Sequence, residues 1–212
     1  MSLVLLSFAA LTLGAADAPA RKRVAIIMDD GPFPGHKEAY LELFAREQVH
    51  ITFAHVGKNV AAHPQLARAA AAAGHEIVNH SYTHPHLKTM DDAAIGKEIA
   101  DTQAAGLAAT GKAPAWFWAP YLEHDERVDA AVRQASGLEH FPFNRYHFIG
   151  SLDWDPATTG AKFRELTTTG IVDGTVILTH EWPQVTFENL EWVIDELKKQ
   201  DVEFVTFSEL AK

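Results

Sequence analysis

The sequence predicts one α/β domain in which a parallel β-sheet is covered by helices. Three observations support this prediction. Segments with strand patterns alternate with segments with helix patterns along most of the 212 residues. No linker rich in proline, glycine or serine divides the chain, and no repeat of about 20–50 residues is visible. A chain of this length commonly folds as one barrel-like unit.

Short apolar segments define the expected strands. Residues 24–28 form an uninterrupted apolar run, which is typical of a buried strand. Residues 175–179 are apolar enough for the centre of a sheet. Further strands are expected at 51–56, 76–79, 115–118, 148–152 and 203–207.

Helical patterns fill the intervals between these strands. The alanine-rich helix 64–73 stops at Gly74, as expected of a C-terminal cap. The helix 91–109 begins with Asp91 and Asp92, whose charges favour the positive end of the helix dipole. Further helices are expected at 36–47, 125–134, 158–167 and, with an amphipathic pattern, 187–199.

Composition excludes several classes of function. There are 18 basic and 28 acidic residues, which give a formal net charge of −10. Nucleic-acid binders need a basic surface to displace counterions, so no nucleic-acid partner is expected. The chain has no cysteine, which excludes disulfides, thiolate metal sites and a cysteine nucleophile.

The N-terminus predicts export. The apolar run 4–16 is followed by Ala-Pro-Ala at 18–20, which fits the small-x-small pattern of a signal-peptide cleavage site. The run is too short to span a bilayer, so no stable membrane insertion is expected. We expect residues 1–20 to be a signal peptide or N-terminal extension, residues 21–212 to be the functional domain, and the protein to be periplasmic or secreted. The alternative is an N-terminal helix packed on the domain.

Polar residues follow several of the predicted strands. In a parallel barrel, the carboxyl ends of all strands lie on one face, where active sites are built. The residues that occupy these positions are Asp29-Asp30, His80, Pro120-Tyr121, Asp153-Trp154 and His180. We therefore expect them to form one functional site.

Two of these motifs contain residue types that bind a divalent metal. His80 and His84 are four residues apart, so a helical turn would place both imidazoles on one face. With one carboxylate from Asp29 and Asp30, they make three ligands for a metal such as zinc and leave one position open for water. The second carboxylate is then free to act as a base on that water, which predicts hydrolysis.

Each motif also has a simpler interpretation. The two aspartates precede a Gly-Pro pair and could belong to an ordinary turn. Pro85 disfavours helical backbone at His84, and the two histidines could be surface residues. His180 could be a hydrogen-bonded core histidine, although at the catalytic face it is a natural general acid. Trp154, beside Asp153, could line a sugar cleft or pack in the core.

From about Val24 to Phe207 the sequence resembles the polysaccharide deacetylase (NodB-homology) family, which is carbohydrate esterase family four. The resemblance implies a distorted (β/α) barrel with fewer than eight repeats, about seven, in a single domain. The matching segments are 28–32, 52–57, 74–77, 80–84, 119–121, 152–154 and 177–180.

The resemblance implies a role for each central residue. Asp30, His80 and His84 would bind a divalent metal, usually zinc, with cobalt, nickel or manganese as alternatives. Asp29 would be the catalytic base and His180 the general acid that protonates the leaving group. The metal would lower the pKa of its bound water and polarise the acetyl carbonyl.

The resemblance also implies a set of substrate-binding residues. Tyr121 would contribute a backbone N–H to the oxyanion. Trp154 and Leu178 would form the pocket that receives the acetyl methyl group. Pro120 and Asp153, from the same motifs, complete the expected set. The implied partner is an acetylated glycan.

Two positions depart from the family pattern. Trp118 stands where the family has an arginine that helps to orient the base, and Gly150 stands where the family has an aspartate that supports the acid histidine. Losing such support typically costs about 10–100-fold in activity or metal affinity. Arg145, Asp155 or Glu181 could take over these roles.

The expected function is a metal-dependent hydrolase acting on carbon–nitrogen bonds other than peptide bonds. It would remove acetyl groups from an N-acetylglucosamine polymer, peptidoglycan or acetylxylan. One alternative is a non-catalytic member of the family that binds a glycan or a metal, which the two departures favour. Another is a related hydrolase that opens the amide of a small cyclic molecule.

Overall fold

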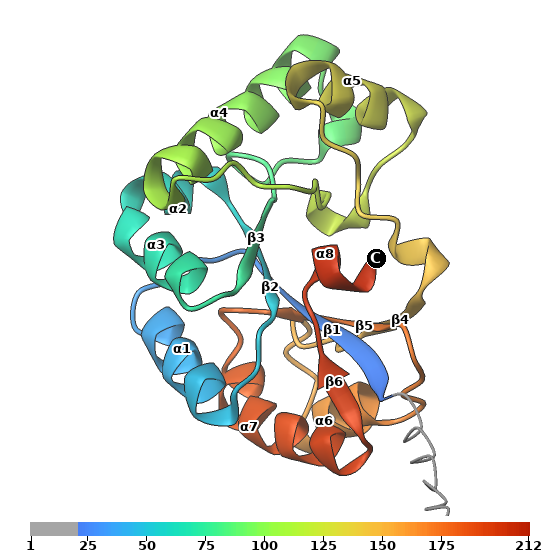
Figure 1. Cartoon of the computed structure of the whole chain (residues 1–212). Coiled ribbons are helices and arrows are strands. Elements are labelled where there is room, and N and C mark those ends of the chain that lie inside the picture. Colours follow the sequence, from blue (N-terminus) through green and yellow to red (C-terminus); the bar gives the residue numbers. More distant parts are fainter. Residues whose placement is uncertain (1–20) are drawn as a thin grey trace, which may run out of the picture.

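Parallel strands form the centre of the protein. The computed structural model describes residues 21–212, so the expected leader at 1–20 lies outside the described residues. Six strands form one sheet in this range, in the order β3-β2-β1-β5-β4, and β6 pairs with the start of β1. Every pairing is parallel, which confirms the α/β class (Figure 1). The strands are β1 Lys22–Asp29, β2 Thr52–His55, β3 Glu76–Asn79, β4 His147–Gly150, β5 Thr175–His180 and β6 Val202–Phe204.

Helices alternate with the strands and surround the sheet. The predicted helices are all present within a few residues of their expected bounds, and the short helices α2 and α8 are additional. No helix in the described range is both long and apolar enough to cross a membrane. The helices are α1 His36–Glu47, α2 Gly57–Ala62, α3 Pro64–Ala72, α4 Asp92–Thr110, α5 Glu126–Ser136, α6 Gly160–Thr168, α7 Gln184–Lys199 and α8 Phe207–Leu210, with 3-10 turns η1 Leu87–Thr89, η2 Pro120–Leu122 and η3 Phe143–Arg145.

Two strand predictions need correction. The segment 115–118 is not a strand, because only Phe117 makes isolated bridges, to the end of β3 and to His140. The segment bonds to the backbone of Asn79 at the end of β3 and to that of Glu139 and Phe141, and this pairing is too short to form a ladder. The predicted strand 203–207 ends at residue 204, because a capping box at its far end starts α8.

The sheet is buried on both faces. In β1, Val24, Ile26 and Met28 belong to a core cluster with residues of α1 and α7. Ala25 and Ile27, which alternate with them, pack in a second cluster with residues of α8. Figure 1 shows α7 and α8 on opposite sides of the sheet. Burial on both faces explains why β1 is an uninterrupted apolar run rather than an alternating one.

Candidate metal centre and active site

The expected site residues gather at one end of the sheet. Asp29 and His180 are the last residues of the adjacent strands β1 and β5, and they are paired in register. His80 follows β3 directly. A cavity of about 490 Å³ lies beside them, lined by Asp29, Asp30, His84, Tyr121, Leu122, Trp154, Leu178, His180 and Trp182.

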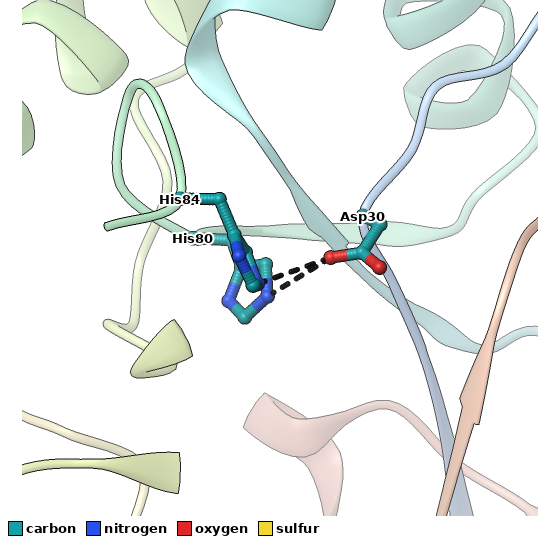
Figure 2. Close-up of side chains that lie close together, drawn as sticks. All are labelled: Asp30, His80 and His84. Atoms are coloured by element: carbon teal, nitrogen blue, oxygen red, sulfur yellow. Dashed lines mark ion pairs between the residues drawn. The ribbon is translucent and has the colours of Figure 1, made fainter. Parts of the chain in front are cut away.

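Three side chains are arranged as a metal-binding group. Oδ1 of Asp30 lies 3.2 Å from Nε2 of His84 and 3.6 Å from Nε2 of His80. Figure 2 shows both imidazole rings turned toward this one carboxylate oxygen. The ligand atoms of the three residues all lie within 4.8 Å of one another. This is a carboxylate and two imidazoles around one point.

The two histidines do not converge through a helical turn, so this part of the prediction is wrong. The segment between them is a loop in which Ser81 has φ 61° and His84 has φ 64°. Pro85 explains why, since the residue before a proline is disfavoured in helical backbone. Glu98 of α4 holds the loop: its carboxylate accepts from the N–H groups of Tyr82 and Thr83, at 2.7 Å in both cases.

Hydrogen bonding fixes which nitrogen of His80 faces the cavity. Nδ1 of His80 lies 2.7 Å from the carbonyl oxygen of Trp118, and a carbonyl can only accept. Nδ1 therefore carries the proton, and Nε2 is directed at Asp30. Such outer hydrogen bonds orient the histidine ligands of protein metal sites.

Several observations fit a divalent cation. Nε2 of His80 and Oδ1 of Asp29 are buried and have no hydrogen-bond partner among the described residues. Although burial opposes it, the charges of Asp29 and Asp30 raise the pKa of His80, so the site draws in positive charge. Burial and the neighbouring His80 lower the pKa of His84 to about 4, which keeps that ring in the neutral form that binds metals. The donor set suits zinc.

Asp30 is held at the backbone and at the side chain. Its φ of 75° turns the chain sharply at the end of β1, so the side chain is brought back toward the histidines. Asn59 donates to its carbonyl oxygen at 2.8 Å. Trp182 donates from its indole N–H to Oδ2 at 2.7 Å. Burial would raise the pKa of Asp30, but His80, His84 and His180 hold it below its ordinary value.

Trp118 holds the other carboxylate, and this overturns the expectation that some other residue replaces the family arginine. The indole N–H of the fully buried Trp118 donates to Oδ2 of Asp29 at 2.9 Å. Trp118 thus supplies a neutral donor where the family has a cation. Burial raises the pKa of Asp29 to about 6, partly offset by His80 and His180. A carboxylate with this pKa is suited to accept a proton near neutral pH.

Asp153 supports His180 by the kind of contact that we expected from an aspartate at position 150. Oδ1 of Asp153 lies 2.7 Å from Nδ1 of His180, and Oδ2 accepts from the His180 backbone N–H at 2.7 Å and from the Thr186 hydroxyl at 2.6 Å. Burial alone would lower the pKa of His180, but the bond to Asp153 and the charge of Asp29 raise it to about 9. The imidazole is therefore protonated at neutral pH.

A buried ion pair links α1 to the end of β5. Glu181, next to His180, lies 2.5 Å from Nζ of Lys37, and both side chains are fully buried. Its other oxygen accepts from the Phe33 N–H at 2.6 Å, and its backbone N–H donates to the Asp29 carbonyl at 3.0 Å. A side chain at Gly31 would collide with this carboxylate, so any residue other than glycine would push Glu181 out of its present position.

The expected substrate-binding residues divide into two groups. Tyr121, Trp154 and Leu178 line the cavity, and the first two are about half exposed. Pro120 and Asp153 are buried and do not line it. Tyr121 has φ 58° and its ring stacks on His86, with centroids 4.1 Å apart.

Sequence reasoning missed four supporting residues. The sequence assigns no contact to Trp182, and the family pattern marks Trp118 as a loss. Glu98 and Lys37 are charged residues within helical segments, where a solvated surface position is the ordinary expectation. For these two, only the tertiary fold shows the contact.

Comparison with known proteins places the chain among deacetylases. A profile of the family described as polysaccharide deacetylase matches residues 16–138. The peptidoglycan-N-acetylglucosamine deacetylase PgdA of Listeria monocytogenes is 29% identical over 193 residues, which cover 91% of this chain and 40% of that protein. The chain therefore spans less than half of the length of this relative.

Solved structures share both the fold and part of the sequence. A family 4 acetyl xylan esterase from Clostridium thermocellum, in complex with a cobalt ion, is 32% identical with a TM-score of 0.79 over 89% of this chain and 90% of its own. A family 4 carbohydrate esterase from Streptomyces lividans, in complex with acetate, is 28% identical with a TM-score of 0.77 over 86% of this chain and 92% of its own. The chain belongs to the polysaccharide deacetylase family, a family of hydrolases, as its motifs predicted.

Proposed function

We propose that this protein is a metal-dependent hydrolase that removes acetyl groups from an acetylated glycan. One observation carries the proposal. A buried carboxylate, Asp29, and a protonated imidazole, His180, end adjacent strands beside an Asp-His-His group. All of these residues except the buried His80 line one cavity. Hydrolysis of an amide needs such a base and such an acid on the two sides of the scissile bond.

We propose an N-acetylglucosamine polymer as the substrate class. The support is the relative from Listeria, which is named for peptidoglycan N-acetylglucosamine. Acetylxylan is the alternative, because the structure from Clostridium thermocellum is that of an acetyl xylan esterase. The aromatic walls Tyr121 and Trp154 suit a sugar ring in either case.

We propose that Asp30, His80 and His84 hold the cation. Zinc suits the donor set, and cobalt is the alternative that the Clostridium structure supports. When bound, a divalent cation lowers the pKa of water and polarises a carbonyl.

The protein's own groups supply the proton transfers. Oδ2 of Asp29 is engaged by Trp118, so Oδ1 is available to accept a proton from the attacking water. The water oxygen bonds to the acetyl carbon, and the backbone N–H of Tyr121 would stabilise the oxyanion. His180 then gives a proton to the amine as the carbon–nitrogen bond breaks. The products are acetate and a free amino sugar.

We propose that the protein is exported and that residues 1–20 are a leader on a catalytic domain of residues 21–212. The support is the apolar run with its small-x-small site, and a relative named for peptidoglycan, which lies outside the cytoplasm. Mass spectrometry of the protein from its own host tests this, since a retained residue 1 on a cytoplasmic protein contradicts it.

Acetate release tests the function. The purified protein is assayed with zinc or cobalt on acetylated chitooligosaccharides, peptidoglycan fragments and acetylxylan. We expect release on at least one substrate, abolition by a chelator, and restoration when metal is added back. Asp29→Asn should lower the rate by at least about 100-fold, the order attributed to a general base. Glycan binding without turnover would instead support a non-catalytic member of the family.

A further inference from the structure

We propose that Trp182 is a positioning residue for the cation, because its indole N–H fixes the carboxylate of Asp30 in the orientation that leaves one oxygen free for binding. This inference rests on the metal site proposed above. It concerns a side chain that lies outside the Asp-His-His group itself and that stands two positions after His180.

The two oxygens of Asp30 have different neighbours. Oδ1 faces Nε2 of both His80 and His84. Oδ2 accepts the indole N–H of Trp182 at 2.7 Å, within the range of a short, charge-assisted hydrogen bond. The bond therefore occupies the oxygen that faces away from the histidines and directs the other oxygen at the point where the three ligands converge.

Asp30 needs this support because of its place in the chain. It lies at a sharp turn with φ 75°, and its side chain is 20% exposed on the cavity wall. A carboxylate in that position can rotate about its own bonds, and rotation would present Oδ2 or both oxygens to the cation. The indole removes this freedom before a cation binds, so the entropic cost of ordering the Asp30 carboxylate on binding is smaller.

Trp154 provides a matched comparison. It is also a tryptophan that lines the same cavity, and it is 55% exposed, against 43% for Trp182. Within the described residues its indole nitrogen makes no hydrogen bond to any of the three ligands. Replacing either tryptophan by phenylalanine keeps an aromatic wall, but only the change at Trp182 removes a hydrogen bond to Asp30.

The test is the affinity of the metal-free protein for Zn²⁺, measured by competition with a chromophoric chelator. We expect Trp182→Phe to weaken Zn²⁺ binding by about 10–100-fold, the range found when outer partners of metal ligands are removed. Trp154→Phe should stay within about twofold of the wild type. Circular dichroism and thermal melting of both variants verify that the fold is retained.

The outcomes separate this inference from the proposed function. If the wild type binds Zn²⁺ and Trp182→Phe binds it equally well, the positioning role is wrong and the metal site stands. If both phenylalanine variants weaken binding equally, an aromatic wall rather than the hydrogen bond is responsible, which also overturns the inference. If the wild type binds neither Zn²⁺ nor Co²⁺, the proposed metal site fails and the positioning role fails with it.

Discussion

Replacement of Asp153 by asparagine should move the alkaline limit of activity to lower pH. The carboxylate of Asp153 lies 2.7 Å from Nδ1 of His180 and is fully buried, so its charge acts on the imidazole with little screening. The elevation of the His180 pKa from 6.5 to about 9 corresponds to about 3 kcal/mol in favour of the protonated ring. Asparagine has a similar shape but no charge.

The size of the expected pKa shift follows from the part of the His180 pKa elevation that Asp153 causes. A hydrogen bond to a charged group is worth about 1.5–3 kcal/mol, which is about 1–2 pKa units. Asp29 and Asp30 supply the rest of the elevation and remain in the variant. We therefore expect the pKa of His180 to fall from about 9 to about 7–8 in Asp153→Asn.

The sign of the pH effect follows from the role of His180 as an acid. The protonated ring is the active form, so the contribution of His180 is fully present below its pKa and is lost as the pH rises through it. For a fall of about 1.5 units, the protonated fraction at pH 8.5 drops by about eightfold, whereas it is nearly unchanged at pH 6.5. The ratio of variant to wild-type kcat/KM should therefore decrease steeply between these two pH values.

Two measurements check the shift. The pH profile of kcat/KM gives the alkaline limit of activity in the active enzyme. NMR titration of the His180 ring in metal-free protein gives the pKa of His180 directly. Thr186→Val is the matched control, because it removes a hydrogen bond to the same carboxylate without removing the charge. An alkaline limit at the same pH in Asp153→Asn and in the wild type would refute the reasoning.

Two further predictions concern the buried support of the site. Trp118→Phe leaves Oδ2 of Asp29 without its donor, so we expect kcat/KM to fall by about 10–100-fold with the fold retained by circular dichroism, since a hydrogen bond to a charged group is worth about 1.5–3 kcal/mol. A fall of less than about threefold would show that the indole is not needed. Lys37→Met leaves the charge of Glu181 buried and unpaired, and urea unfolding should show a loss of about 3–5 kcal/mol. Adding Glu181→Gln to Lys37→Met should recover part of this loss, and a double variant as unstable as the single one would contradict the explanation.

The strands and helices could be predicted largely because local patterns decide them. The apolar run of β1 reflects burial on both faces, and the glycine after α3 has φ 87°, which few other residues adopt. The segment 115–118 has the same apolar character but is not a strand. Its backbone bonds to Asn79 on one side and to Glu139 and Phe141 on the other, and no local pattern reveals that these pairings stay so short.

The candidate site was predictable where it depends on strand ends, and less so where it depends on packing. Asp29 and His180 follow apolar runs, so a rule about parallel strands was enough to bring them together. The roles of Trp118 and Asp153 could not be read in the same way. The family pattern marked Trp118 as a loss. Only the distance of 2.9 Å from its indole nitrogen to Oδ2 of Asp29 shows that the indole donates a hydrogen bond to the base.

The carboxylate of Glu98 links α4 to the proposed cation site. Both histidines of that site belong to one loop, and this side chain of α4 accepts hydrogen bonds from two backbone N–H groups of the loop. Thermodynamic linkage makes the dependence reciprocal. A change that destabilises α4 lowers the affinity of the site for the cation, and a bound cation protects α4 against local opening. The amides of α4 would then exchange their hydrogens more slowly when zinc is present, although α4 supplies none of the three proposed ligands.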